Sequence, residues 1–261
     1  MKATNWEFEN RALIFGLIFA AAFQFYFLDQ QIAPTALANW IAAKLQRSDE
    51  AVLRSLFGVA GLLLVVAAVI RTWASAYLHA DVVYAAEVKT SSLVADGPYR
   101  YVRNPLYFAN VLMAIGMGAM ASFPGFVFAV LAMLVFSYRL ILREEAELQA
   151  KQGERYQQYR KAVPRLWPSL WPRIPSAGKK AKWADGLKAE LWYWGFALSV
   201  IVFAITLKVR WFFLILGASI PIFWVSSVML QRKGKSPVNH KGHEGTQNGP
   251  ETKRPGKGGG L

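Results

Sequence analysis

The sequence contains no cysteine and only three histidines. Without cysteine the chain can form no disulfide, thiolate nucleophile or cysteine metal site. His79 stands alone, and His240 and His243 lie in a C-terminal stretch rich in Gly, Lys and Pro. Because a metal site needs several converging ligands, this set predicts no metal site.

Charged residues are also scarce: they make up 18% of the 261 residues, against 54% hydrophobic residues. Long apolar runs in such a composition are typical of a polytopic membrane protein rather than a soluble domain. In a soluble protein the formal net charge of +14 would indicate binding to nucleic acid. Here the Lys and Arg side chains flank the apolar runs, as in cytoplasmic loops, so we expect membrane lipids and no nucleic acid as partners.

Six apolar segments predict an all-α fold with about six transmembrane helices. Several are shorter than the roughly 20 residues that span a bilayer, but flanking Trp, Tyr and Arg can extend them into the interface. The tripeptide Phe123-Pro124-Gly125 joins the third and fourth segments and predicts a tight hairpin. The segments are residues 13–28, 56–70, 106–122, 126–142, 191–207 and 211–230.

The first segment carries three consecutive alanines, Ala20 to Ala22, which a signal peptide could use for cleavage. Glu7 and Glu9 precede it, however, and its apolar run is longer than a typical signal core. We therefore expect a retained span.

The distribution of Lys and Arg predicts the orientation. Twelve of them lie between Tyr138 and Glu190, and seven follow Leu230, so both regions are expected in the cytoplasm. Six spans then leave both termini in the cytoplasm, and the connections after the second and fourth spans share that side. The lack of cysteine and the short loops favour a prokaryotic inner membrane. The tail from residue 232 to 261 is expected to be disordered.

Two polar motifs fall at this shared face. In the first, Asn104 and Pro105 predict a helix start, with Asn as N-cap and Pro at the first helical position. Arg103 beside it suits a bidentate carboxylate, and the helix N-terminus adds partial positive charge. Plain interface anchoring is the alternative for this motif.

The second motif contains Glu144 and Glu145, which on a helix point about 100° apart, so only one can face a given pocket. Alone they would be read as partners for nearby Arg and Lys. With Arg103 they supply sites for both charged ends of an amino acid. S-adenosylmethionine carries these two charges and a sulfonium cation, which aromatic faces can surround. The candidate tyrosines are Tyr99, Tyr107, Tyr156 and Tyr159.

These residues resemble the membrane methyltransferases of the isoprenylcysteine carboxyl methyltransferase and phospholipid methyltransferase group, over roughly residues 71–167. The first part of the signature matches at Gly97, Pro98, Tyr99, Arg103, Pro105 and Tyr107. The second part matches at Glu144, Glu145, Leu148, Gly153, Tyr156, Tyr159, Val163 and Pro164. The chain departs from the signature at Asn104, where the family usually has His, and at Ala109, where it usually has Gly. Asn can still donate a hydrogen bond or cap the helix, but it cannot titrate near neutral pH.

The resemblance implies an S-adenosylmethionine-dependent methyltransferase with a lipophilic acceptor that enters from the bilayer. It implies catalytic roles for Arg103, Glu144 and Glu145. The implied cofactor-binding residues are Tyr99, Arg103, Asn104, Pro105, Tyr107, Glu144, Glu145, Tyr156 and Tyr159. The implied divisions are a first span with its external connection (1–54), a methyltransferase core with the cytoplasmic cofactor segment (55–175), a C-terminal membrane hairpin (176–231) and a basic tail (232–261).

The acceptor and the reaction class remain open at this stage. An isoprenylcysteine-type carboxylate and a phospholipid amine both fit, so both O- and N-methylation are considered. The alternatives are a steroid-reductase-like NADPH-dependent enzyme and a non-catalytic transporter or scaffold. Arg71, Trp73, Tyr77 and His79 end the second span and are read as an interface belt, or as lining of the acceptor route. Gly116 and Gly118 are expected to serve close helix packing.

Overall fold

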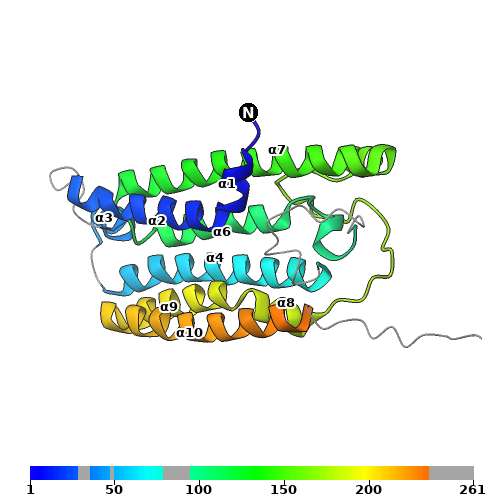
Figure 1. Cartoon of the computed structure of the whole chain (residues 1–261). Helices are drawn as coiled ribbons and strands as arrows, with labels where there is room; N and C mark the ends of the chain where they lie inside the picture. The colour runs from blue at the N-terminus through cyan, green and yellow to red at the C-terminus, as the bar shows by residue number, and fades with distance from the viewer. Residues whose placement is uncertain (29–35, 48–49, 79–94, 235–261) are drawn as a thin grey trace, which may run out of the picture.

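The computed structural model describes residues 1–28, 36–47, 50–78 and 95–234, and all regular elements within these ranges are helical (Figure 1). The predicted all-α class is therefore confirmed for the described chain. The two tail histidines and His79 lie outside these ranges. The elements are α1 (Asn5–Glu9), α2 (Arg11–Leu28), α3 (Leu37–Lys44), α4 (Glu50–Tyr77), η1 (Gly97–Arg100), α6 (Pro105–Gly118), α7 (Phe123–Ala162), α8 (Trp183–Ala189), α9 (Leu191–Thr206) and α10 (Val209–Gly234).

Each predicted apolar segment lies mainly within one of the longer helices, α2, α4, α6, α7, α9 and α10. Two of these, α4 and α7, are long and apolar enough to cross a membrane. A third crossing is reached if α8 and α9, bent by 65° at their junction, count as one broken span. Among the described residues α2, α6 and α10 contribute shorter apolar stretches. The fourteen residues of α6 extend about 21 Å, less than the hydrocarbon thickness of about 30 Å.

Helix α4 lies at the centre of the bundle, with α6 on one side and α9 on the other (Figure 1). Helix α7 packs on α6 and α2, and α10 packs on α9. Small residues allow the central contacts: a Cβ added to Gly116 would lie 2.9 Å from the Ala60 carbonyl oxygen, and one added to Gly61 would lie 2.8 Å from Ile201. Gly116 thus has the predicted packing role.

The predicted hairpin between the third and fourth apolar segments is present, but its turn lies earlier than expected. Helix α6 ends at Gly118, and Phe123-Pro124-Gly125 form the first turn of α7 rather than the connection. The reason is the cap: the hydroxyl of Ser122 accepts a hydrogen bond from the Gly125 amide at 3.3 Å, and Pro fits the first helical turn.

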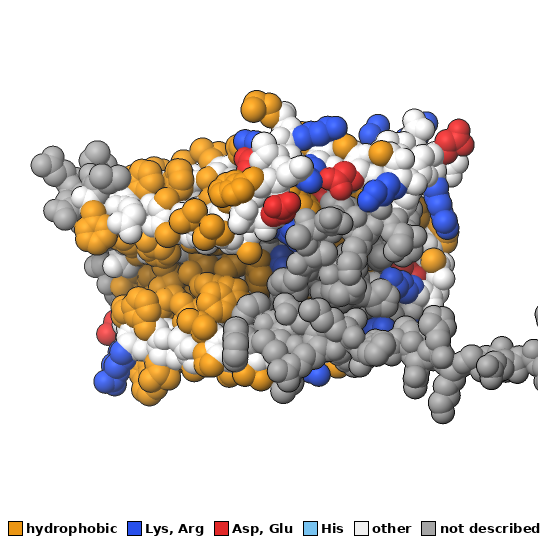
Figure 2. Space-filling view, in the orientation of Figure 1, with side chains coloured by type: hydrophobic (Ala, Val, Ile, Leu, Met, Phe, Trp, Pro, Cys, Tyr) orange, Lys and Arg blue, Asp and Glu red, His pale blue; other side chains and the backbone are white. Residues whose placement is uncertain are grey.

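Helix α7 continues far beyond its apolar part. Its 40 residues would measure about 60 Å as a straight helix, roughly twice the hydrocarbon thickness. Gly153, with φ +56° and ψ −128°, breaks the helical path in a conformation that side-chain-bearing residues rarely adopt. Charged side chains gather around this extended part, whereas hydrophobic side chains cover the opposite end of the bundle (Figure 2). We call the end with η1 and the extension of α7 the polar end.

Gly125 provides a test of the packing between α2 and α7. A Cβ on Gly125 would lie 2.3 Å from the carbonyl oxygen of Ala22, so Gly125→Ala is expected to lower the stability by about 1–3 kcal/mol through forced separation of the helices. The matched control is Gly58→Ala in α4, where the added Cβ meets nothing within 4 Å. Thermal unfolding in detergent should show a lower midpoint only for the Gly125 variant, and equal midpoints would contradict this packing.

Candidate functional site

The carboxylate of Glu145 joins three parts of the chain at the polar end. Its Oε1 forms an ion pair with Arg103 Nη2 at 3.2 Å and accepts a hydrogen bond from Asn104 Nδ2 at 3.3 Å. Its Oε2 accepts from Arg165 Nε at 3.0 Å. The residue is only 4% exposed. We call these four residues the Glu145 cluster, and the segment 163–182 that carries Arg165 the strap.

Arg103 also binds the end of α7 and the beginning of the strap. Its Nη1 donates to the Arg160 carbonyl at 3.0 Å, and its backbone amide donates to the Pro164 carbonyl at 2.9 Å. Its Nε is buried and has no hydrogen-bond partner among the described residues. Buried guanidinium donors are normally satisfied, so this nitrogen is available to an anionic ligand.

Asn104 stands at the predicted N-cap position, with Pro105 as the first residue of α6, but its side chain does not cap the helix. The amide nitrogen instead donates to Glu145 and, at 2.9 Å, to the Arg165 carbonyl. The prediction that the Asn104 side chain caps α6 is therefore wrong, because this side chain is bonded to two acceptors from other parts of the chain. An uncharged amide fulfils this role without titrating.

Glu144 and Glu145 face different partners, as their predicted separation on the helix requires. Tyr107, in the first turn of α6, donates its hydroxyl hydrogen to Glu144 Oε1 at 2.6 Å. Beside this pair the N-terminal segment covers α7: the ring of Phe8 lies between the guanidinium groups of Arg11 and Arg143, at 4.5 and 4.8 Å. The position of this segment beside the site was not predicted from the sequence.

The remaining predicted tyrosines lie at the same end of the bundle. Tyr159 donates to the carbonyl of Tyr99 at 2.8 Å, and the Tyr156 and Tyr159 ring centroids are 6.0 Å apart. The Tyr99 hydroxyl is buried without a hydrogen-bond partner among the described residues. Burial raises the pKa of this phenol well above its ordinary value, with Tyr159 and Glu144 adding to the effect, so it stays protonated and can donate. Within the described part of the chain, two buried polar groups of the site therefore lack a hydrogen-bond partner, on Arg103 and Tyr99.

The strap is hydrogen-bonded to η1 and to the residue before it, Asp96. Asp96, 3% exposed, accepts hydrogen bonds from the Ser176 hydroxyl at 2.8 Å and the Lys179 amide at 2.9 Å. Burial alone would raise the pKa of the Asp96 carboxyl, but these bonds and that from the Gly97 amide together lower it. Arg100 Nε also donates to the Ile174 carbonyl at 2.9 Å. Neither Asp96 nor the strap contacts could be recognised from local sequence.

Arg71 is not an interface residue, contrary to one of the two sequence-based interpretations, because it is buried between helices. Its Nε pairs with Glu190 Oε2 at 2.5 Å, and its Nη1 donates to Asn110 Oδ1 at 2.8 Å. Its guanidinium lies 4.0 Å from the Tyr193 ring centroid. Glu190, at the bend between α8 and α9, is 0% exposed and also accepts from Ser75 at 2.5 Å. This ion pair connects the C-terminal helices to the core, and the role of Glu190 in it was not predicted from the sequence.

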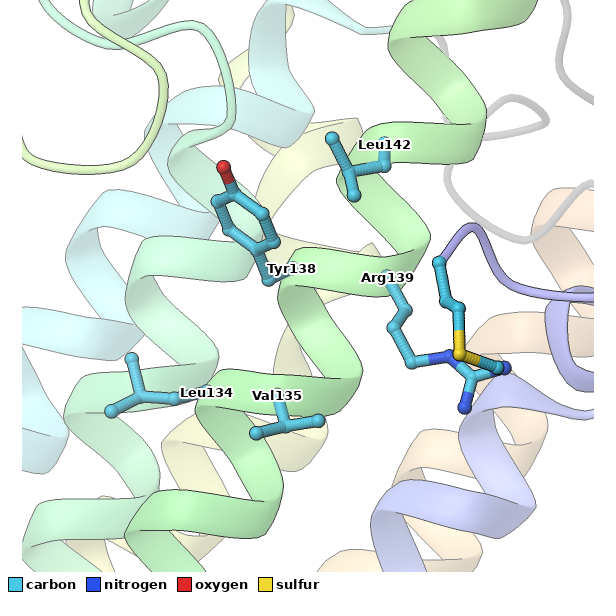
Figure 3. Close-up of a pocket in the computed structure, with 6 residues that line it drawn as sticks. Leu134, Val135, Tyr138, Arg139 and Leu142 are labelled. Atoms are coloured by element: carbon cyan, nitrogen blue, oxygen red, sulfur yellow. The ribbon is translucent and has the colours of Figure 1, made fainter.

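A shallow groove of about 480 Å³ lies on the outer face of α7 (Figure 3). Its lining residues are Met1, Leu134, Val135, Tyr138, Arg139 and Leu142. The Tyr138 hydroxyl accepts from Arg165 Nη1 at 2.6 Å, so the apolar groove adjoins the Glu145 cluster. Across the described residues, no group of three or more potential metal ligands is present.

Part of the chain, including Arg103 and Glu145, is similar to a known protein family. Residues 55–155 match the family described as phospholipid methyltransferase. This match confirms the resemblance derived from the sequence motifs, and with the long apolar helices it makes the chain an integral membrane protein. No solved structure matches the chain.

Two curated relatives bear names of metal resistance. The chain is 27% identical over 53% of its length to the nickel-cobalt-cadmium resistance protein NccN of Alcaligenes xylosoxydans xylosoxydans, and 32% identical over 38% to the cobalt-zinc-cadmium resistance protein CzcN of Cupriavidus metallidurans. The matched regions cover 62% and 43% of these relatives. The chain therefore spans less than two thirds of the length of either relative.

Removal of the Glu145 carboxylate tests whether the site depends on it. Glu145→Ala would leave the Arg103 and Arg165 guanidinium groups without their shared anion, so we expect a loss of about 3–5 kcal/mol. The control is Glu147→Ala on the same helix, which removes a partly exposed pair with Arg143 and should cost at most about 1 kcal/mol. Thermal unfolding in detergent compares them, and a similar small loss in both would contradict the central role of Glu145.

The attachment of the strap at Asp96 should fail in acid. Because the pKa of Asp96 is lowered in the folded protein, its stabilising contribution is full above the unfolded pKa of about 3.9 and is lost as the pH falls through the lower folded value. The chain has no cysteine, so a spin label at Ala177→Cys is unique. We expect its mobility to rise below about pH 4. In Asp96→Asn the label should be mobile at every pH; an acid transition retained in that variant would show that another group is responsible.

Proposed function

We propose that this protein, which matches the phospholipid methyltransferase family over residues 55–155, transfers a methyl group from S-adenosylmethionine to a lipophilic acceptor. The observation that carries the proposal is the buried Arg103 side chain, whose Nε has no hydrogen-bond partner among the described residues and whose Nη2 pairs with the Glu145 carboxylate. Arg103, Tyr99, Tyr107 and both glutamates lie within the matched segment. Bound cofactor would supply an electrophilic methyl group.

The residues present fit the charges of this cofactor. Arg103 would hold its carboxylate, with Asn104 and the start of α6 at Pro105 alongside. Because Glu145 already pairs with Arg103, the ligand carboxylate would compete with Glu145 for the guanidinium. Once Glu145 is released from Arg103, either Glu145 or Glu144 would hold the ammonium group of the cofactor. The faces of Tyr99, Tyr107, Tyr156 and Tyr159 would surround the sulfonium.

The remaining work of the chain is positioning and exclusion of water. A carboxylate acceptor of the isoprenylcysteine type is already a nucleophile and needs only orientation toward the methyl group. A phospholipid amine would need deprotonation, and Glu144, held by the Tyr107 hydroxyl, is the candidate base. The family description favours this second acceptor, whereas the names of the two relatives concern metal resistance and identify neither acceptor.

In this proposal the six long helices all lie in the membrane, with the polar end and both termini in the cytoplasm of a prokaryotic cell. The core of residues 55–175 holds the cofactor, and residues 1–54 and 176–231 complete the membrane part. The basic residues of the strap and of the extension of α7 support the cytoplasmic assignment.

Calorimetric titration of S-adenosylmethionine into detergent-purified protein tests the cofactor. We expect binding that weakens by about tenfold or more, at least about 1.4 kcal/mol, in Arg103→Lys, because Lys cannot bind a carboxylate through two parallel donors, and in whichever of Glu144→Gln and Glu145→Gln removes the carboxylate that holds the ammonium. Arg54→Lys, which alters an exposed pair with Glu50, is the control and should bind as the wild type does. No binding by the wild type, with or without lipid, would refute the proposal.

The role of the tyrosine rings is tested by comparing binding of the cofactor with binding of its demethylated product, whose sulfur carries no positive charge. Tyr156→Leu should weaken binding of S-adenosylmethionine more than binding of the product, because only the sulfonium gains from an aromatic face. Tyr156→Phe retains the ring and should preserve the difference. Equal losses for both ligands would exclude Tyr156 from the sulfonium site.

A further inference from the structure

The strap carries an exposed apolar patch that the site does not use. Trp167, Leu170 and Trp171 are 63%, 89% and 76% exposed. The backbone that presents them is nevertheless fixed, because the Ser169 amide donates to the Tyr101 carbonyl at 3.0 Å and the Arg173 amide donates to the Arg100 carbonyl at 2.9 Å. Large side chains held outward on an ordered backbone indicate a binding surface rather than a frayed loop.

The position of the patch indicates what covers it. The Trp167 ring packs edge-on against Phe108 in the first turn of α6, with centroids 5.9 Å apart. The patch therefore lies where apolar helices meet the polar end, which is the level that tryptophan prefers in membrane proteins. A bilayer is already present around this integral membrane protein, so its interface is the nearest apolar partner.

The charged side chains of the segment that carries the patch all have one sign. Between Glu154 and Asp185 the sequence contains eight basic residues and no acidic residue. Arg173 and Lys180, on either side of the attachment at Asp96, are exposed. Such a basic segment with outward tryptophan and leucine matches the composition of surfaces that insert among anionic headgroups.

We infer that the strap is an interfacial anchor, which inserts Trp167, Leu170 and Trp171 among the headgroups of an anionic bilayer. The same segment carries Arg165, whose guanidinium binds Glu145. Contact with the membrane surface therefore holds one wall of the Glu145 cluster in place. The inference does not depend on methyl transfer, because it rests on the patch and its charge alone.

Site-directed spin labelling tests the anchor directly, since the chain contains no cysteine. A label at Leu170→Cys is compared with one at Ala177→Cys, an exposed strap position away from the patch. Both are measured in nanodiscs of phosphatidylcholine with phosphatidylglycerol, and in discs of phosphatidylcholine alone. Collision with oxygen reports the apolar layer, and collision with a water-soluble nickel chelate reports solvent.

We expect the label at position 170 to show the higher ratio of oxygen to nickel accessibility in anionic discs. The ratio should fall in neutral discs and in Arg173→Gln with Lys180→Gln, because both changes weaken attraction to the surface. The label at position 177 should follow solvent throughout. Equal ratios at the two positions, a ratio that does not respond to lipid charge, or spin coupling between two copies at position 170 would each overturn the anchor. All readouts work without cofactor, so failure of the proposed function would leave this test intact.

Discussion

One buried carboxylate connects the parts of this protein that are distant in sequence. Glu145 on α7 holds Arg103 and Asn104 at the start of α6, and Arg165 on the strap. A buried anion with two guanidinium partners is stable only when all three are correctly placed, because each unpaired charge would be costly. The geometry of the polar end therefore depends on this residue, and a ligand carboxylate could enter only by replacing part of its hydrogen bonding.

Much of this arrangement was predictable because hydropathy and chain direction are simple physical constraints. The apolar runs gave the six long helices, and the start of α6 at Pro105 followed from its residue types. A hairpin between α6 and α7 returns the chain to the face from which it left. For that reason the Arg103 and Glu144 motifs were expected to meet, and Arg103 does contact the neighbouring Glu145.

The partners of these residues were less predictable, because long-range contacts leave no local periodicity. Glu190 appeared to be one charge in a basic connection, yet the bend between α8 and α9 buries it against Arg71. Asp96 directly precedes the Gly97-Pro98-Tyr99 motif, but nothing in the local sequence shows that it binds the strap. Asn104 was expected to cap α6, but Glu145 and a carbonyl compete for the same donor. Only the folded chain decides such competitions.

The most direct test of the cofactor site is to locate bound S-adenosylmethionine on the chain. Ultraviolet cross-linking of the labelled cofactor to the membrane-embedded protein, followed by peptide mapping, should place the label on peptides covering residues 97–107 or 144–163. Excess demethylated product should abolish that labelling. Label found on the outer groove of α7 or on α9 and α10, with the Glu145 cluster unmarked, would contradict the account.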